Sequence, residues 1–145
     1  MLYILDTDHI SLLQRDNPQV IANLARIDEK NRAATVITVV EQIQGWLAFI
    51  RRGIQAQDAA RGFERLREAM AFYLTIQIFL PYDAAAVAEF ERLRRNKIRI
   101  GTQDLRIASI ALSKNATVLT RNMRDFGRVP GLKIEDWSVP TKKDE

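Results

Sequence analysis

Short apolar runs alternate along this chain with longer segments of helical periodicity, and this alternation restricts the available folds more than any other feature. The runs are rich in β-branched and aliphatic residues and span 2–5, 34–38, 77–80, 117–120 and 132–135. Strands separated by helices within one domain favour a parallel sheet with helices on both faces. We therefore predict an α/β fold with a short, mostly parallel central sheet of four to five strands.

The helical segments carry start signals and apolar faces. Asp8 is expected to cap a helix that ends near Gln14, and Thr102 to cap a helix that follows the strongly basic region. Further helices are predicted from Pro18 and over 83–95. Two longer helices, one ending at Gly53 and the next over about 57–74, should form a helical hairpin. In the first, Val40, Ile43, Leu47 and Ile50 share one stripe, and in the second the helix is indicated by the spacing of Phe63, Leu66, Met70 and Tyr73.

The composition indicates one globular domain without disulfides. A chain of 145 residues with 47% apolar residues can bury a sizeable core, and we expect a single domain over 1–139 with a disordered tail at 140–145. The absence of cysteine excludes thiolate metal sites and cysteine nucleophiles. Neither a secretory signal nor an apolar run of membrane-spanning length is present, so a cytoplasmic protein is expected.

Basic residues exceed acidic ones and are unevenly spread. The net charge of +4 mildly favours a polyanionic partner such as RNA. Five basic residues crowd the stretch 92–99, and Arg121 begins a second group with Arg124 and Arg128. A solvated helix face is an equally good explanation of the first group. The candidate RNA contacts are Arg95, Lys97, Arg99 and Arg121.

Four acids fall where strand ends or helix starts would bring them to one edge of the sheet: Asp6, Glu41, Asp104 and Asp125. Each alone is explained by helix capping, and residues 38–41 match a capping box. Capping gives no reason for all four to meet. Two carboxylates about 4 Å apart repel by roughly 4 kcal/mol at an effective dielectric of 20, so the cluster needs a proton or a cation. Oxygen ligands suit Mg²⁺ or Mn²⁺, and such a centre is suited to metal-assisted phosphodiester hydrolysis.

Four motifs in this order resemble those of the PIN-domain ribonucleases, and more narrowly the VapC toxins of bacterial type II toxin–antitoxin pairs. They are Leu5-Asp6-Thr7-Asp8, Thr38-Val39-Val40-Glu41, the segment 100–108 around Gly101-Thr102-Gln103-Asp104, and the segment 120–126, which ends in Asp125-Phe126. The resemblance extends from residue 2 to about Trp137. It implies the three-layer PIN-like fold and a metal-dependent endoribonuclease.

The resemblance also implies roles for single residues. Asp6 and Asp104 would be the principal ligands of Mg²⁺ or Mn²⁺, Glu41 a further ligand or a water-positioning base, and Asp125 would complete the site, directly or through water. Thr7 and Thr120 would support these acids with their hydroxyls. Asp8 departs from the family, since many relatives carry Asn there, and its role is left open.

Partners follow from the same resemblance. It implies a homodimer, a cognate antitoxin whose C-terminal segment covers the acidic pocket, and an RNA substrate for which transfer RNA is the family-level expectation. The predicted hairpin that carries Arg51 is the expected platform for both protein contacts.

Two other functions are compatible with parts of the sequence. Asp6-Thr7-Asp8 after a strand also fits a phosphatase of the haloacid dehalogenase type, with Asp6 as nucleophile, although no matching downstream Lys and acid pair is found. A binding module that has lost catalysis is the second alternative. The single histidine, His9, and the two tryptophans, Trp46 and Trp137, are interpreted as structural residues rather than as a base or base-stacking platforms.

Overall fold

The computed structural model, which describes residues 1–140, contains a five-stranded sheet in which every neighbouring pair of strands is parallel. The strand order is β3-β2-β1-β4-β5. The strands are β1 (Tyr3–Leu5), β2 (Arg32–Thr35), β3 (Ile78–Leu80), β4 (Thr117–Leu119) and β5 (Lys133–Glu135). The predicted α/β architecture and parallel sheet are therefore confirmed.

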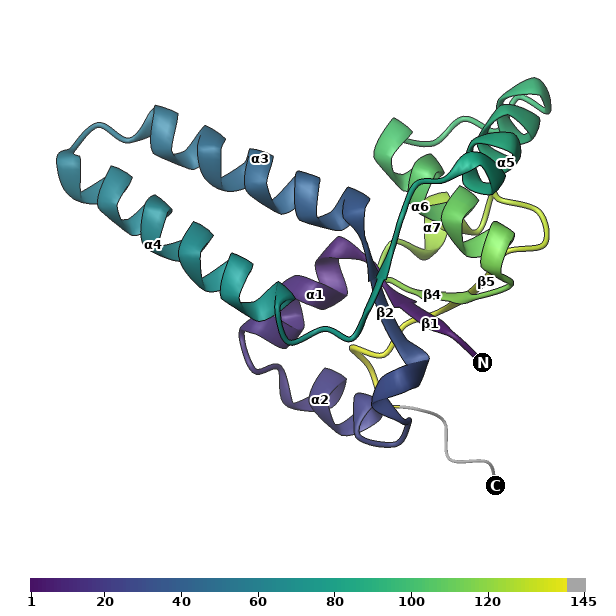
Figure 1. The fold of residues 1–145 in the computed structure, drawn as a ribbon, viewed down its shortest axis with the longest axis horizontal. Helices are drawn as coiled ribbons and strands as arrows, with labels where there is room; N and C mark the ends of the chain where they lie inside the picture. Colours follow the sequence, from purple (N-terminus) through teal and green to yellow (C-terminus); the bar gives the residue numbers. More distant parts are fainter. Residues whose placement is uncertain (141–145) are drawn as a thin grey trace.

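The helices cover both faces of this sheet (Figure 1). One side carries α1 (Thr7–Gln14), α2 (Pro18–Leu24) and the base of α4 (Ala56–Tyr73). The other side carries α5 (Ala84–Arg95), α6 (Thr102–Lys114) and the short α7 (Met123–Phe126). The remaining helices are α3 (Val36–Arg52) and the 3-10 helix η1 (Glu29–Asn31).

The central strand β1 shows why three layers form. Ile4 and Leu5 are both buried, but they belong to two different apolar clusters because successive side chains of a strand point to opposite faces. Ile4 packs with residues of α5, α6 and α7, whereas Leu5 packs with residues of α1, α2 and α4. A strand buried on both faces needs helices on both faces.

The chain builds the sheet in two directions from β1, first through β2 to β3 and later through β4 to β5. The order reverses between β1 and β4, which pair in register at Leu5 and Leu119. In open α/β sheets, ligands bind beyond the carboxyl ends of the strands at such a reversal. Asp6 and Thr120 are the residues that leave the two strands at this point.

Three predicted boundaries are wrong by a few residues. The second strand ends at Thr35, not at residue 38, because the Thr35 hydroxyl caps α3 by accepting from the Thr38 amide at 3.3 Å. Asp6, and not Asp8, caps α1. Thr102 is the first residue of α6, and the capping position is Gly101.

Helices α3 and α4 form the predicted hairpin, which projects from the body of the molecule (Figure 1). Its base is fastened by a polar network in which the side chains of Gln14 and Gln42 donate to each other, at 3.1 and 2.9 Å. Gln42 also donates to Ser11 and accepts from the Tyr73 hydroxyl. These bonds join α1, α3 and α4.

The apolar stripes of the hairpin are only partly buried. Tyr73, at the base, is buried, but Phe63 and Met70 are each 57% exposed and Val40 is 38% exposed. The two helices predicted from this periodicity are therefore present, although much of their apolar stripe is exposed. A hairpin that projects beyond the sheet has no core to pack against along most of its length.

The segment after β5 returns to the sheet and is held there. The Trp137 ring packs on Tyr3, with ring centroids 4.8 Å apart, and the Asn23 amide donates to the Trp137 carbonyl at 2.9 Å. Of the predicted disordered tail, 140–145, all but residue 140 lies outside the described residues. Within residues 1–140, no helix combines the length and apolar character needed to cross a membrane.

Candidate active site

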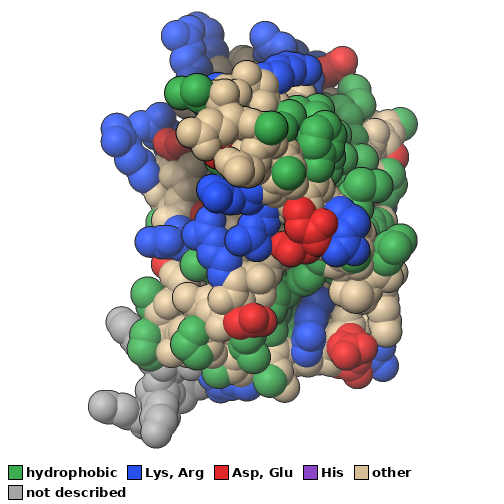
Figure 2. Space-filling view, turned by 90° about the vertical axis from the view of Figure 1, so that its left-hand side faces the viewer, with side chains coloured by type: hydrophobic (Ala, Val, Ile, Leu, Met, Phe, Trp, Pro, Cys, Tyr) green, Lys and Arg blue, Asp and Glu red, His purple; other side chains and the backbone are tan. Residues whose placement is uncertain are grey.

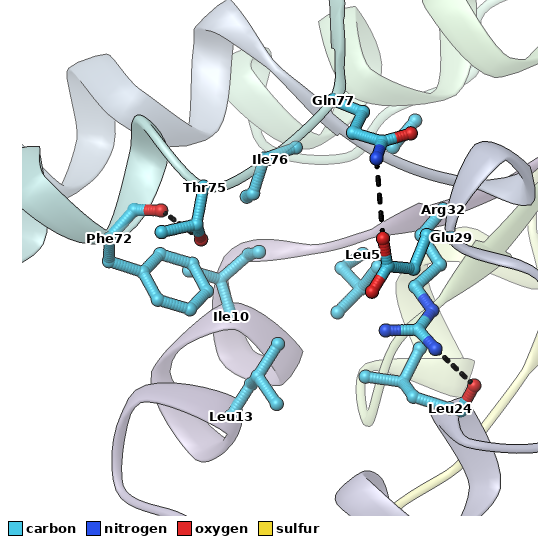
Figure 3. A pocket seen from close by; sticks show the side chains of 11 residues that line it. Leu5, Ile10, Leu13, Leu24, Glu29, Arg32, Phe72, Thr75, Ile76 and Gln77 are labelled. Carbon is cyan, nitrogen blue, oxygen red and sulfur yellow. Dashed lines mark hydrogen bonds between the residues drawn. The ribbon is translucent and has the colours of Figure 1, made fainter.

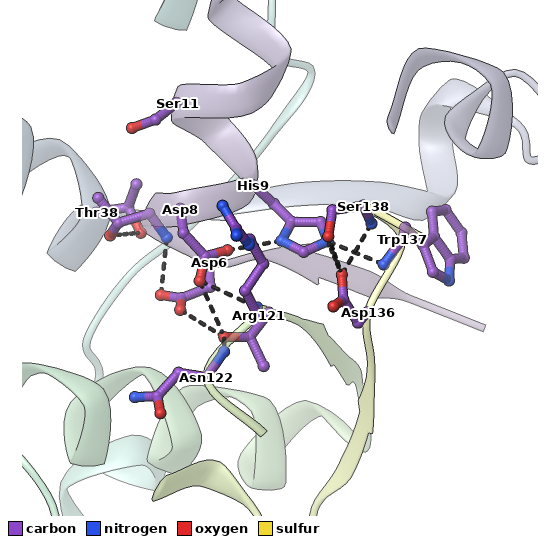
Figure 4. Close-up of polar contacts among 12 residues, drawn as sticks. Asp6, Asp8, His9, Ser11, Thr38, Arg121, Asn122, Asp136, Trp137 and Ser138 are labelled. Atoms are coloured by element: carbon purple, nitrogen blue, oxygen red, sulfur yellow. Dashed lines mark hydrogen bonds and ion pairs between the residues drawn. The ribbon is translucent and has the colours of Figure 1, made fainter. Parts of the chain in front are cut away.

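Asp6 occupies the carboxyl end of the central strand, and both of its carboxylate oxygens are engaged (Figure 4). Oδ1 accepts from the Thr7 amide at 2.7 Å and Oδ2 accepts from the Thr120 hydroxyl at 2.9 Å. The side chain is nearly inaccessible, at 5% exposure. Residues that leave β1 and β4 therefore hold one buried acid in a fixed orientation.

Glu41 reaches the same edge from the second turn of α3. Its Oε1 accepts from the Thr7 hydroxyl at 2.8 Å, and that hydroxyl also lies 3.2 Å from the hydroxyl of Thr38. Because α3 begins at Val36, both Thr38 and Glu41 lie inside the helix, and their spacing of three residues puts them about one turn apart on the same side. Thr7 thus connects the Asp6 and Glu41 positions.

Asp104 and Asp125 are bridged by a single amide. Asn122, which caps α7, donates from Nδ2 to Asp104 Oδ2 at 3.3 Å and to Asp125 Oδ2 at 3.1 Å. Asp104 comes from the first turn of α6, so this bridge fixes the start of α6 to α7. Asn122 was not among the predicted site residues, although its place two residues after Thr120 in the fourth motif was a usable signal.

The acids raise one another's pKa values. Burial, the nearby charge of Asp8 and, more weakly, that of Asp104 raise the pKa of Asp6 to about 7. Burial together with the charges of Glu41, Asp125 and Asp8 raises the pKa of Asp104 to about 6. The four predicted acids thus share one electrostatic environment in which full ionisation is disfavoured.

This donor set fits a hard divalent cation. Within residues 1–140, no Lys or Arg forms an ion pair with Asp6, Glu41, Asp104 or Asp125, so their charges are not compensated by the protein. All of the available donor atoms are oxygens, which Mg²⁺ and Mn²⁺ prefer. Over the same residues, no three acids are drawn together tightly enough to form a complete ligand shell.

Comparison with known proteins assigns the family. Over 141 residues the chain is 33% identical to ribonuclease VapC1 of Haemophilus influenzae, with 95% of this chain and 99% of the relative covered. The chain belongs to the VapC family of ribonucleases. No protein-family model matches the chain.

Two further relatives support this membership. The tRNA(fMet)-specific endonuclease VapC of Salmonella typhimurium is 27% identical over 139 residues, which are 93% of this chain and 97% of that one. The structure of VapBC-1 from nontypeable Haemophilus influenzae superposes with a TM-score of 0.72 at 26% identity and covers 96% of this chain. The prediction of a ribonuclease that is the toxin of a toxin–antitoxin pair is therefore confirmed. Membership of the VapC family excludes the alternative prediction of a haloacid dehalogenase-type phosphatase.

Asp8 lies beside the acids and binds protein groups. Its Oδ2 accepts from the Arg121 amide at 3.0 Å and lies 3.4 Å from the Thr120 hydroxyl, while its Oδ1 lies 2.6 Å from His9 Nδ1. His9 is fully buried and Trp137 is 6% exposed, so neither ring is free to stack on a nucleotide base. Trp46 is half-buried against Phe49, with ring centroids 5.8 Å apart.

The predicted RNA-contacting residues of this VapC-family chain are all exposed. Arg95 ends α5, and Lys97 and Arg99 lie in the loop that leads into α6 and Asp104. Arg121 follows Thr120 directly. Basic side chains gather across the middle of the face on which the hairpin ends, with acidic side chains beside them (Figure 2).

A separate recess of about 220 Å³ lies on the α1 and α4 side of the sheet (Figure 3). Its walls include Leu5, Ile10 and Phe72, and none of the acids described above lines it. Arg32 is held there by donation from Nη2 to the Leu24 and Ile27 carbonyls, at 2.9 and 3.2 Å. The recess is thus distinct from the acid cluster.

Proposed function

We propose that this protein is an Mg²⁺- or Mn²⁺-dependent endoribonuclease whose ion is held by Asp6, Glu41, Asp104 and Asp125. The observation that carries this proposal is the gathering of these four acids at the reversal point of the sheet, held by Thr and Asn side chains and without a Lys or Arg partner in residues 1–140. The raised pKa values of Asp6 and Asp104 agree with this crowding. A divalent cation is the partner that would let these carboxylates ionise together. When bound, it would polarise the scissile phosphate and activate water.

Each side chain has a distinct task in this proposal. Asp6, fixed by Thr7 and Thr120, supplies an oriented ligand at the centre of the site. Asn122 keeps Asp104 and Asp125 facing the same space, so that Asp104 can bind the ion and Asp125 can bind it directly or through water. Glu41 acts as a further ligand or as the base that positions the attacking water, its carboxylate directed by Thr7.

The proposed substrate is a structured RNA, with transfer RNA favoured by the name of the Salmonella relative. The exposed Arg95, Lys97, Arg99 and Arg121 flank the segments that carry Asp104 and Asp125, where they can contact phosphates. We place the activity in the cytoplasm, where such a substrate is found.

The proposed partners are a cognate antitoxin and a second copy of the chain. The related Haemophilus structure is a VapBC assembly, which supports an antitoxin for this chain as well. The projecting hairpin exposes Ile54, Phe63 and Leu74, and burial of such side chains favours association. We propose the hairpin as the homodimer contact and 1–139 as a single domain.

The decisive experiment uses full-length protein freed of antitoxin and incubated with total RNA in Mn²⁺ or in EDTA. We expect cleavage in Mn²⁺ only, and its loss in Asp6→Asn. Asp16→Asn is the matched control, because Asp16 is exposed in a turn with φ of 57°, a conformation that Asn also tolerates. Cleavage that persists in EDTA would overturn the metal proposal. RNA binding without cleavage in either condition would favour the inactive binding module.

A further inference from the structure

The acid at position 8 and the histidine at position 9 form one hydrogen-bonded unit beside the active site (Figure 4). His9 is fully buried, with Nδ1 2.6 Å from Asp8 Oδ1 and Nε2 3.0 Å from the backbone nitrogen of Trp137. A backbone N–H can only donate, so Nε2 must be the acceptor. The ring therefore carries its hydrogen on Nδ1 and donates it to Asp8.

A second carboxylate near Nε2 does not alter this assignment. Asp136 Oδ1 lies 3.6 Å from Nε2, and it already accepts from the Ser138 amide at 2.8 Å and the Ser138 hydroxyl at 2.6 Å. The Trp137 amide makes the shorter contact with the ring nitrogen.

The two donors that face Asp8 explain why this position needs a carboxylate. One oxygen accepts from His9 and the other accepts from the Arg121 amide. An Asn side chain has only one acceptor oxygen, so its NH₂ group would face one of these donors. If the His9 hydrogen moved from Nδ1 to Nε2, the ring could accept from an Asn at position 8. Its Nε2–H would then face the N–H of Trp137, and two donors would oppose each other. A carboxylate at position 8 together with a histidine at position 9 therefore satisfies all of these donors and acceptors.

We propose that His9 is a positioning residue for the nuclease, acting through the Asp8 carboxylate on the Arg121–Asn122 turn. The contacts run from His9 to Asp8, from Asp8 to the Arg121 amide, and from the next residue, Asn122, to Asp104 and Asp125. The same ring anchors the C-terminal segment through Trp137. The catalytic consequence rests on the function proposed above.

Two substitutions of His9 separate its two bonds. In His9→Asn, the amide nitrogen can replace Nδ1 as donor to Asp8, but the acceptor for Trp137 is lost. In His9→Gln, an oxygen can accept from Trp137, but the donor to Asp8 is lost. Each variant loses one bond, so their thermal stabilities should fall by similar amounts. A purely structural role therefore predicts equal activity.

We expect His9→Gln to lower kcat about tenfold, with KM for RNA unchanged, and His9→Asn to stay within about threefold of the wild type. Asp8→Asn should lower kcat about tenfold in the wild-type chain and little further in the His9→Gln chain. Equal rates for the two His9 variants, or independent effects of the Asp8 and His9 changes, would overturn the proposal.

A readout without catalysis tests the same contacts in metal-free protein. Because His9 is the only histidine, ¹⁵N spectra of labelled imidazole need no assignment. We expect the hydrogen on Nδ1, and we expect His9→Gln but not His9→Asn to shift the Arg121 and Asn122 amide resonances. A hydrogen on Nε2, or unshifted amides, would overturn the proposal even if the wild type cleaves RNA. If the wild type does not cleave RNA, the function fails while these spectra still decide the positioning.

Discussion

The hydroxyl of Thr7 donates to Glu41 across 34 positions of sequence, over 2.8 Å. Thr7 opens the helix that follows the first strand, and Glu41 lies in the helix that follows the second. This bond brings two of the motifs recognised in the sequence into one site. The acids are thus held by neutral hydroxyl and amide groups, which leave their negative charge uncompensated within residues 1–140.

Asp104→Asn should lower the rate of RNA cleavage at least about 100-fold, since it removes a proposed metal ligand rather than a supporting contact. In EDTA at a pH above 7, the same substitution should also raise the melting temperature. The reason is that burial and the charges of Glu41 and Asp125 disfavour the ionised carboxyl of Asp104. A rise of about 2–4 °C corresponds to about 1 kcal/mol for a domain of this size. Cleavage assays and calorimetry check both effects, and a wild-type rate would refute the role of Asp104.

The metal-free protein should become more stable as the pH falls from 8 to 5. The pKa of Asp6 is raised from 3.8 to about 7 and that of Asp104 to about 6, so the folded state binds protons that the unfolded chain releases. The destabilisation is therefore fully present above pH 7 and is lost as the pH falls toward 4. Each proton that the folded state binds in excess changes the free energy of unfolding by at most about 1.4 kcal/mol per pH unit.

Urea unfolding in EDTA at several pH values measures this dependence. The variant that carries both Asp6→Asn and Asp104→Asn is the control, and its free energy of unfolding should vary less over the same range. A wild-type stability that falls steadily from pH 8 to pH 5 would contradict the raised pKa values.

Arg121→Ala should weaken RNA binding to a similar extent for different sequences and reduce the slope of log K against log salt by about 0.7–1. The side chain is exposed, whereas the contact with Asp8 uses the backbone amide, which alanine retains. Lys30→Ala is the control, since Lys30 lies in η1, before the amino end of β2 and away from the acids. Filter binding in an Asp6→Asn background measures the slope, and equal slopes for the two variants would exclude the phosphate contact.

Gly62→Ala should destabilise the hairpin. An added Cβ would lie 2.4 Å from Ile50 Cγ1 and 3.0 Å from Phe49 Cδ1. Overpacking of this kind costs about 1–3 kcal/mol, and at so short a contact it should exceed the gain in helix propensity of up to about 1 kcal/mol. Gly45→Ala meets nothing within 4 Å and should stabilise by about 0.5–1 kcal/mol. Urea unfolding compares the two, and equal effects would refute the packing argument.

The sequence allowed the strands and the acids to be predicted because each carries a local signal. Apolar runs such as 2–5 mark buried strands, and four acids lie at strand ends or helix starts. The boundaries of helices and strands were less predictable where two nearby residues could both act as the helix cap. Thr35 and Thr38 can each cap α3, and only tertiary packing decides between them.

Properties that depend on tertiary structure could not be predicted from local patterns. The exposure of Phe63 and Met70 follows from the projection of the hairpin, which no helical periodicity reveals. The role of Asp8 depended on Trp137, a residue more than one hundred positions away, because the Trp137 amide fixes the tautomer of His9. The bridge from Asn122 to two acids likewise required the pairing of α6 with α7.

The attachment of Trp137 to His9 makes the order of the acid cluster depend on a distant segment. Trp137 follows β5, whereas Asp8 and His9 follow β1, and 128 positions separate the two bonded residues. Local unfolding of the segment after β5 would therefore break a buried bond to the ring that contacts Asp8.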